Sequence, residues 1–141
     1  AALTFTNKAA NEMKERIARF LGTHTNLPFI GTFHSYCVQL LKRNQEHLEN
    51  PFFSILDDDD QQKMISALLQ RAQLQKQFSA KTVAYQISHM KNHQIDASNP
   101  ALHYLHNPLL EELYHAYEKE KKASKVLDFD DLLLQVLKLF Q

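Results

Sequence analysis

The chain has 141 residues, enough for one ordinary hydrophobic core or for a small domain together with part of another. Its 16 basic residues balance its 16 acidic residues, so no global positive field attracts nucleic acid and any such contact must be local. A single cysteine, Cys37, excludes an internal disulfide framework, and the absence of a long apolar run or a signal pattern predicts a cytoplasmic protein without a membrane span.

The first predicted element is a short strand that leads directly into a helix. Leu3 to Thr6 alternates as strand residues do, and helical spacing then predicts a helix from Asn7 to Leu21 that ends at Gly22. The apolar stripe of this helix consists of Ala10, Met13, Ile17 and Phe20. Strand tips of this kind carry binding sites in open α/β sheets.

A second strand-to-helix unit follows. Phe29 to Thr32 reads as a strand, and Thr32 can cap the next helix. The apolar face of that helix comprises Phe33, Tyr36, Cys37, Leu40 and Leu41. Two such units in succession predict a fragment of an α/β sheet.

From Asn50 onward the sequence predicts helices and no further strands. Capping residues mark the helix starts: Asp57 or Asp58, Ser79, Asn107 before Pro108, and Asp128 with Asp131 three residues on. The last of these helices carries a wide apolar stripe from Phe129 to Phe140. The predicted fold class is therefore mainly α, with a small α/β part.

Three segments, in this order, resemble motifs Ia, Ib and Ic of the UvrD/Rep/PcrA family of superfamily 1 DNA helicases. They are LTFTNKAANEM from Leu3, GTFHS from Gly31 and LDFDDL from Leu127. Weaker patterns around Ile55 to Gln61 and Ile87 to Asn92 are similar to the inserted helical domain, 1B, of that family.

The resemblance implies a division of the chain. Residues 1–49 would be part of a RecA-like P-loop NTPase motor domain, 50–125 the inserted helical domain, and 126–141 the return to the motor. The chain would then be a middle piece, opening along a strand at Ala1 and stopping at Gln141 before the second ATP motif.

The sequence contains no phosphate-binding loop of the G-x-x-x-x-G-K-[ST] type. Such a loop needs several glycines, and the chain has only Gly22 and Gly31. It also lacks an apolar strand ending in Asp-Glu that would hold Mg²⁺. We therefore expect no catalytic residues here, and the resemblance assigns ATP and Mg²⁺ to other parts of the parent protein.

Candidate DNA-binding residues gather at the two strand-to-helix junctions. Single-strand binding needs rings for base stacking and donors for phosphates, and a helix N-terminus favours an anion. The candidates are Phe5, Thr6, Asn7, Lys8, Thr32, His34 and Ser35. The resemblance implies that Phe5, Thr6 and Asn7 contact the DNA strand along which the helicase moves. It also implies that Thr32 and His34 hold the backbone of that strand. Two plainer alternatives stay open: Phe5 as a core ring and Thr32 as an N-cap alone.

Other charged clusters have competing interpretations. The basic run Lys119, Lys121, Lys122 and Lys125 could contact duplex phosphates or merely complement a helix C-terminus. The carboxylates of LDFDDL favour capping and docking over a metal site. His89 and His93 share a helical face, but no further ligand completes a metal set, so no metal site is predicted.

The resemblance implies ATP-driven 3′→5′ translocation along single-stranded DNA and unwinding at duplex junctions, in repair or replication restart. Two alternatives remain: the motor part of a helicase–nuclease subunit, and a non-enzymatic helical interaction module. The oligomeric state is open.

Overall fold

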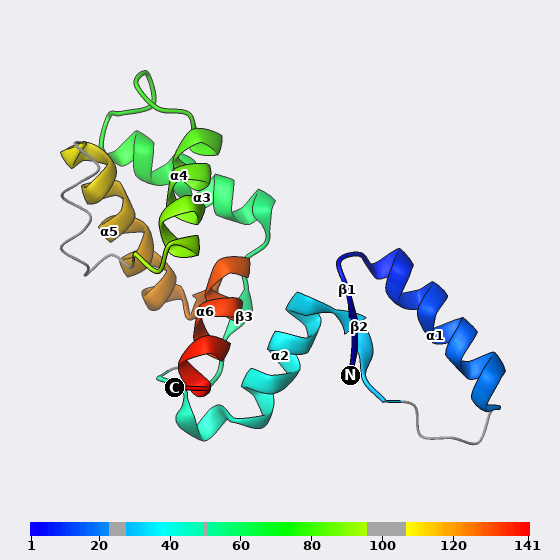
Figure 1. Cartoon of the computed structure of the whole chain (residues 1–141). Helices are drawn as coiled ribbons and strands as arrows, with labels where there is room; N and C mark the ends of the chain where they lie inside the picture. Colours follow the sequence, from blue (N-terminus) through cyan, green and yellow to red (C-terminus); the bar gives the residue numbers. More distant parts are fainter. Residues whose placement is uncertain (23–27, 50, 96–106) are drawn as a thin grey trace.

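The computed structural model of the chain describes residues 1–22, 28–49, 51–95 and 107–141 (Figure 1). Its elements in chain order are β1 (Ala2–Thr4), α1 (Asn7–Leu21), β2 (Ile30–Thr32), α2 (Phe33–Arg43), the 3-10 helix η1 (Gln45–His47), β3 (Ser54–Ile55), α3 (Asp58–Arg71), α4 (Ala80–Asn92), α5 (Pro108–Ser124), β4 (Val126–Leu127) and α6 (Phe129–Leu139). The mainly helical character with small parallel sheets agrees with the predicted class. None of the described helices combines the length and hydrophobicity needed to cross a bilayer.

The first two strands form a parallel pair. Leu3 lies opposite Gly31 and Thr4 opposite Thr32, so both strands end at the same edge. The first strand stops at Thr4, two residues earlier than predicted, because the Thr4 hydroxyl accepts a hydrogen bond from the backbone N–H of Thr6 at 3.1 Å and turns the chain there. Helix α1 spans Asn7 to Leu21, as predicted.

The prediction of no strands after Asn50 is wrong. Strand β3 pairs in parallel with β4, with Ser54 opposite Val126 and Ile55 opposite Leu127. Two-residue strands cannot show a period-2 pattern, and the partners are far apart in sequence, so neither local signal reveals the pairing. This pair holds the start of α6 beside the segment that enters α3 (Figure 1).

Among the described residues, all the buried apolar residues except Ala10 and Ile30 fall into two separate clusters. The larger one lies among α3, α4 and α5: Leu56, Ile65, Leu68, Leu69, Val83, Ile87, Met90, Leu110, Leu113, Tyr114 and Tyr117. The smaller one joins α2 to α6 through Cys37, Leu41, Leu132 and Val136. Burial raises the pKa of the Cys37 thiol, as expected for a packed cysteine.

Some predicted apolar stripes are largely exposed. In α1 only Ala10 is buried, whereas Phe20 is 91% exposed. Helix α1 rests on β1 and β2, and two strands of three residues cover little of its face. At the end of α6, Leu137 and Phe140 are also exposed.

Candidate nucleic-acid interface

The two predicted junction motifs meet at one edge of the β1–β2 pair. Because Thr4 and Thr32 are register partners, Phe5 and Phe33 leave the strands side by side. Their ring centroids are 5.2 Å apart, at an interplanar angle of 37°. Phe5 is 89% exposed, so it is not a core ring in this structure. The pair therefore offers solvent an aromatic surface at the strand tips.

Both junctions continue into capped helix starts. The Thr6 side chain accepts a hydrogen bond from the N–H of Ala9 at 3.2 Å, and the Thr32 side chain accepts one from the N–H of Ser35 at 3.3 Å. Neither helix has an acidic residue in its first turn, so the positive end of each helix dipole is not neutralised locally. The two helix starts consequently favour an anion such as a phosphate.

The polar candidates differ in how far they are already engaged. The Ser35 hydroxyl donates to the Thr32 carbonyl oxygen at 2.8 Å and accepts from the Thr32 hydroxyl at 3.0 Å. Thr32 is thus an N-cap, as one of the two interpretations expected. The side chains of Asn7 and Lys8 are exposed on the first turn of α1, where they can reach a ligand.

Gly31 allows the second junction to pack closely. A Cβ atom at this position would lie 2.6 Å from a ring carbon of Phe29 and 2.8 Å from Oγ of Ser35. Real Cβ atoms do not approach other atoms so closely, so a side chain here would displace the Phe29 ring or the first turn of α2.

His34 connects the second motif to the third. Its ring centroid lies 5.1 Å from that of Phe129, the first residue of α6, at an angle of 60°. Phe129 also belongs to the apolar packing between α2 and α6. The three sequence motifs are therefore joined by two ring contacts, Phe5 to Phe33 and His34 to Phe129.

The third motif forms a capping box at the start of α6. The Asp128 side chain accepts a hydrogen bond from the N–H of Asp131 at 2.9 Å, and the Asp131 side chain accepts one from the N–H of Asp128 at 3.0 Å. This is the capping arrangement expected from the sequence. Asp130 is half-buried, and this burial raises the pKa of its carboxyl group.

The two capping carboxylates also belong to a buried lysine cluster, defined here as Lys91, Glu118, Lys121, Asp128 and Asp131. Lys91 Nζ lies 2.6 Å from Asp128 Oδ2, 2.7 Å from Asp131 Oδ1 and 3.0 Å from Glu118 Oε1. Lys121 Nζ lies 2.9 Å from Glu118 Oε1 and 3.0 Å from Asp128 Oδ2, and it also pairs with Asp131. The side chains of Lys91, Lys121 and Asp128 are at most 3% exposed.

Hydrogen bonds to neighbouring groups complete the cluster. The Tyr117 hydroxyl donates to Asp128 Oδ2 at 2.8 Å and accepts from Gln61 Nε2 at 3.0 Å. Burial alone would raise the pKa of Asp128, but the two lysines outweigh it and hold the pKa below its usual range. Burial alone would lower the pKa of Lys91, but the surrounding carboxylates raise it above its ordinary value. Both groups therefore stay charged at neutral pH.

The cluster corrects one predicted contact. Lys121 was expected to be able to meet duplex phosphates, but its ammonium group is buried and ion-paired, so a phosphate cannot reach it and that prediction is wrong. Glu118, Asp128 and Asp131 bring oxygens close enough together to hold a cation. The two ammonium groups already occupy that position among the oxygens.

The other lysines of the basic run lie at the surface. Lys119, Lys122 and Lys125 are exposed, and Lys122 Nζ lies 3.7 Å from Glu49 Oε2. Lys125 ends α5 in the left-handed conformation, with φ of 52°. Their exposure leaves all three accessible to a polyanion.

The histidine pair on α4 makes local contacts. The ring centroids of His89 and His93 are 4.4 Å apart, and Nδ1 of His93 lies 2.8 Å from the carbonyl oxygen of His89. A hydrogen bond there requires Nδ1–H, because a carbonyl oxygen only accepts. Among the described residues, no carboxylate or thiol joins these two rings in a group of three ligand atoms.

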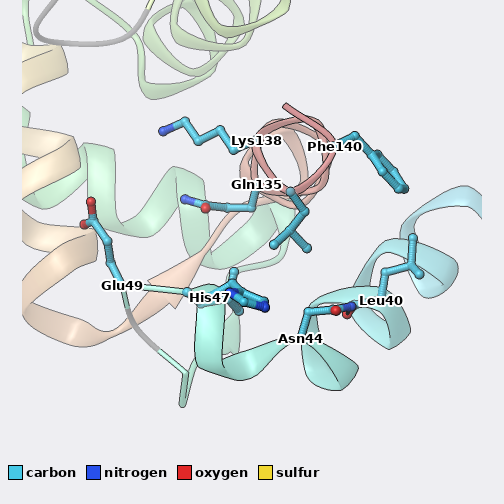
Figure 2. Close-up of a pocket in the computed structure, with 9 residues that line it drawn as sticks. Leu40, Asn44, His47, Glu49, Gln135, Lys138 and Phe140 are labelled. Carbon is cyan, nitrogen blue, oxygen red and sulfur yellow. Dashed lines mark hydrogen bonds between the residues drawn. The ribbon is translucent and has the colours of Figure 1, made fainter.

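A cavity of about 560 Å³ lies at the far end of α2 from the aromatic pair. Figure 2 shows Leu40 of α2 and its C-cap residue Asn44 facing Gln135 of α6 across it, with His47 of η1 on the same side as Asn44. At ~1.5 Å of rise per residue, the six residues from His34 to Leu40 separate this cavity from His34 by about 9 Å along α2. The cavity is thus distinct from the interface at the strand tips.

The comparisons with known proteins agree with the family that the sequence resembles. The family model described as the UvrD/REP helicase N-terminal domain matches residues 1–141. The chain belongs to this family. It is 39% identical over 144 residues to the ATP-dependent DNA helicase PcrA of Bacillus subtilis, a match that covers 99% of the chain and 19% of the relative.

Two further relatives give the same result for this UvrD/REP domain. The ATP-dependent DNA helicase PcrA of Staphylococcus aureus is 34% identical over 145 residues, and the probable DNA helicase II homolog of Mycoplasma capricolum is 36% identical over 151 residues. Each match covers 99% of the chain and 20% of the relative. The chain therefore spans about a fifth of the length of the curated relatives that it matches.

Sequence reasoning missed the two buried lysines of the cluster. Lys91 lies four residues after the buried Ile87, and Lys121 four residues after the buried Tyr117. Each lysine thus continues an inward-facing helical row, which was the available signal. Two of the three carboxylates that balance Lys91, Asp128 and Asp131, lie 37 and 40 residues further on, so local sequence does not reveal them.

Proposed function

We propose that this chain supplies part of the DNA-contacting surface of an ATP-dependent DNA helicase that moves 3′→5′ along a single strand. The observation that carries the proposal is the exposed Phe5–Phe33 pair at the tips of two parallel strands, beside two helix starts without local acidic charge. Rings and phosphate-accepting helix starts in one place are what sequence-independent strand binding needs. Membership of the family supports the helicase class.

Each side chain has a distinct role in this proposal. Phe5 stacks on a base, because its ring is exposed and supported from one side by Phe33. Asn7 and Lys8 bind phosphate at the start of α1. Thr6 and Thr32, whose side chains cap the helices, act through the shape of those helix starts, and His34 contacts the strand from α2.

The proposal assigns different roles to different segments of the chain. Residues 1–49 and 126–141 would be motor segments and 50–125 an inserted helical domain, a division supported by the separate apolar clusters. ATP and Mg²⁺ would bind elsewhere in the parent protein, since the sequence has no glycine-rich phosphate loop. The exposed Lys119, Lys122 and Lys125 would meet the duplex at a junction, in repair or replication restart.

A comparison of two exposed phenylalanines tests the proposal. Phe5→Ala should weaken binding of a fluorescent oligothymidylate to the 141-residue chain by about 1–3 kcal/mol, because a stacking ring is removed. Phe20→Ala is the matched control, since that ring is equally exposed but lies at the other end of α1. Anisotropy titrations at fixed salt give the affinities, and thermal unfolding checks that both variants fold.

The outcomes separate the alternatives. Equal affinities for Phe5→Ala, Phe20→Ala and the unmodified chain would remove the aromatic pair from the interface and favour a helical interaction module. A selective loss with Phe5→Ala would support a strand-binding motor segment. The helicase–nuclease alternative shares this segment, and a nuclease assay on the parent protein distinguishes it.

A further inference from the structure

The start of α6 is the place where the two apolar clusters meet, and charged side chains make the connection. Lys91 comes from α4, Lys121 and Glu118 from α5, and Asp128 and Asp131 from the start of α6. Helices α4 and α5 belong to the larger apolar cluster, whereas α6 packs with α2 in the smaller one. The buried lysine cluster thus bridges the two.

This connection fixes the start of α6 more tightly than apolar contacts would. The hydrophobic effect is non-directional, whereas charge-assisted hydrogen bonds require particular distances and directions. Asp128 and Asp131 each serve twice, as members of the capping box and as partners of the lysines. Moving the lysines would therefore disturb the cap itself.

A short path leads from this cap to the proposed strand contacts. Phe129 directly follows Asp128, and its ring packs 5.1 Å from the ring of His34. His34 lies in the first turn of α2, next to Phe33, whose ring supports Phe5. A shift of the α6 start would move the surface on which His34 rests.

We propose that Lys91 and Lys121 are positioning residues for strand binding: by holding the start of α6 they set Phe129, and through Phe129 the orientation of His34. The inference rests on the proposed function of His34. It makes the inserted helices part of the strand-binding apparatus without any contact of their own to the strand.

The charges of the cluster explain why both lysines are needed. The cluster contains two ammonium groups and three carboxylates, so it carries a net charge of −1 when all are ionised. Removing Lys91 leaves three carboxylates around one lysine in a buried site. Such an excess is relieved by protonation, by water entry or by separation of the carboxylates. Separation moves the capping box, and Phe129 with it.

A double-mutant cycle tests this path. In the 141-residue chain, Lys91→Met should weaken oligothymidylate binding about three- to tenfold when His34 is present, and should have little effect in a His34→Ala background. Lys81→Met is the control, because that lysine is exposed on the same helix. Equal fold losses in both backgrounds would overturn the inference.

Two further measurements keep the test decisive. The ring proton resonances of His34 should shift in Lys91→Met without DNA and stay unchanged in Leu69→Ala, which weakens the larger apolar cluster without touching the charges. If Lys91→Met does not fold, Phe129→Leu removes the ring on which His34 rests, and it should reproduce the binding loss and be non-additive with His34→Ala. Additive losses there would overturn the inference.

Failure of the inference is distinguishable from failure of the proposed function. Loss of binding with Phe5→Ala but not with His34→Ala would leave the strand-binding function standing and remove the path through His34. No loss with either variant would remove both. The Phe5→Ala result therefore reports on the function, and the cycle reports on the positioning role.

Discussion

Two regions of the molecule place rings and charges in unusual surroundings. The edge of the β1–β2 pair that carries Phe5 and Phe33, called here the strand-tip edge, exposes an aromatic ring, whereas the buried lysine cluster removes charges from water. At the edge, Phe5 is 89% exposed, whereas the Lys91 side chain at the cluster is 2% exposed. Apolar side chains usually gain free energy by burial, and charges are usually left in water. Both exceptions therefore need a physical explanation.

The explanations differ. An exposed ring contributes little to folding and remains available to a flat ligand such as a base. A buried lysine is costly unless carboxylates and hydrogen bonds surround it, and the arrangement that satisfies it is close to unique. We therefore propose that the strand-tip edge contacts DNA and that the buried lysine cluster positions other residues. Substitutions in the cluster should mainly change the stability of the fold, and substitutions at the edge should mainly change DNA binding, so both quantities are measured for each variant.

The largest expected effect is on stability at the cluster. Lys91→Met should lower the free energy of unfolding by about 3–5 kcal/mol, because it leaves buried carboxylates short of a counter-ion. Lys81→Met, on the exposed face of the same helix, should leave it nearly unchanged. Urea denaturation followed by circular dichroism measures both. Similar small losses for the two variants would show that water reaches the cluster.

A second prediction concerns the pH dependence of the cluster. The folded-state pKa of Asp128 lies below its usual range, so its contribution to stability is present above about pH 4 and is lost as the pH falls further. The pKa of Lys91 is raised, so its contribution is present below about pH 10.4 and is lost as the pH rises through the folded-state value. The contribution of these two groups to stability should therefore be constant between these limits.

Asp128→Asn isolates this contribution. At neutral pH the variant should be less stable by about 1.5–3 kcal/mol, the usual value of hydrogen bonds to a charged group. The difference from the unmodified chain should shrink below about pH 4, because Asp128 then takes up a proton in the unfolded state while the folded state still holds it charged, which favours unfolding of the unmodified chain. Denaturant unfolding at several pH values measures it. A difference that stays constant down to acid pH would mean that Asp128 is not the group that titrates.

Local signals in the sequence were sufficient for the helix starts. Thr32, Ser79 and Asp128 cap their helices as predicted, because a capping side chain bonds to a backbone N–H only two or three residues away. The exposure of Phe5 could not be predicted, because strand alternation placed Leu3 and Phe5 on the same face and allowed a core ring. Only the short strands of the structure show how little covers that face.

Long-range partners were beyond local reasoning. The pairing of Ser54 with Val126 joins segments that the described helices α3, α4 and α5 separate, and two residues carry no periodic signal. Burial of Lys121 depends on carboxylates that only the fold brings together. The contrast between Lys121 and its neighbour Lys122, 74% exposed, could not be read from a run of lysines.

The smallest expected effect concerns these neighbouring lysines. If Lys122 and Lys125 meet duplex phosphates, replacing both with Met should reduce the slope of log affinity against log salt by about 0.9 for each phosphate that is no longer neutralised. Stability should hardly change, because both side chains are exposed. Lys121→Met should do the opposite: it should destabilise the chain and leave the slope unchanged, since its ammonium group is already paired with Glu118 and Asp128.

Duplex titrations of the folded variants over a range of salt concentrations separate these cases. Single-strand affinity is the internal control, because the strand-tip edge does not include the end of α5. An unchanged duplex slope after replacement of Lys122 and Lys125 would limit their role to the C-terminal end of the α5 dipole. A reduced slope with Lys121→Met would mean that the cluster opens when duplex binds, and position and contact would then no longer be separate functions of the two regions.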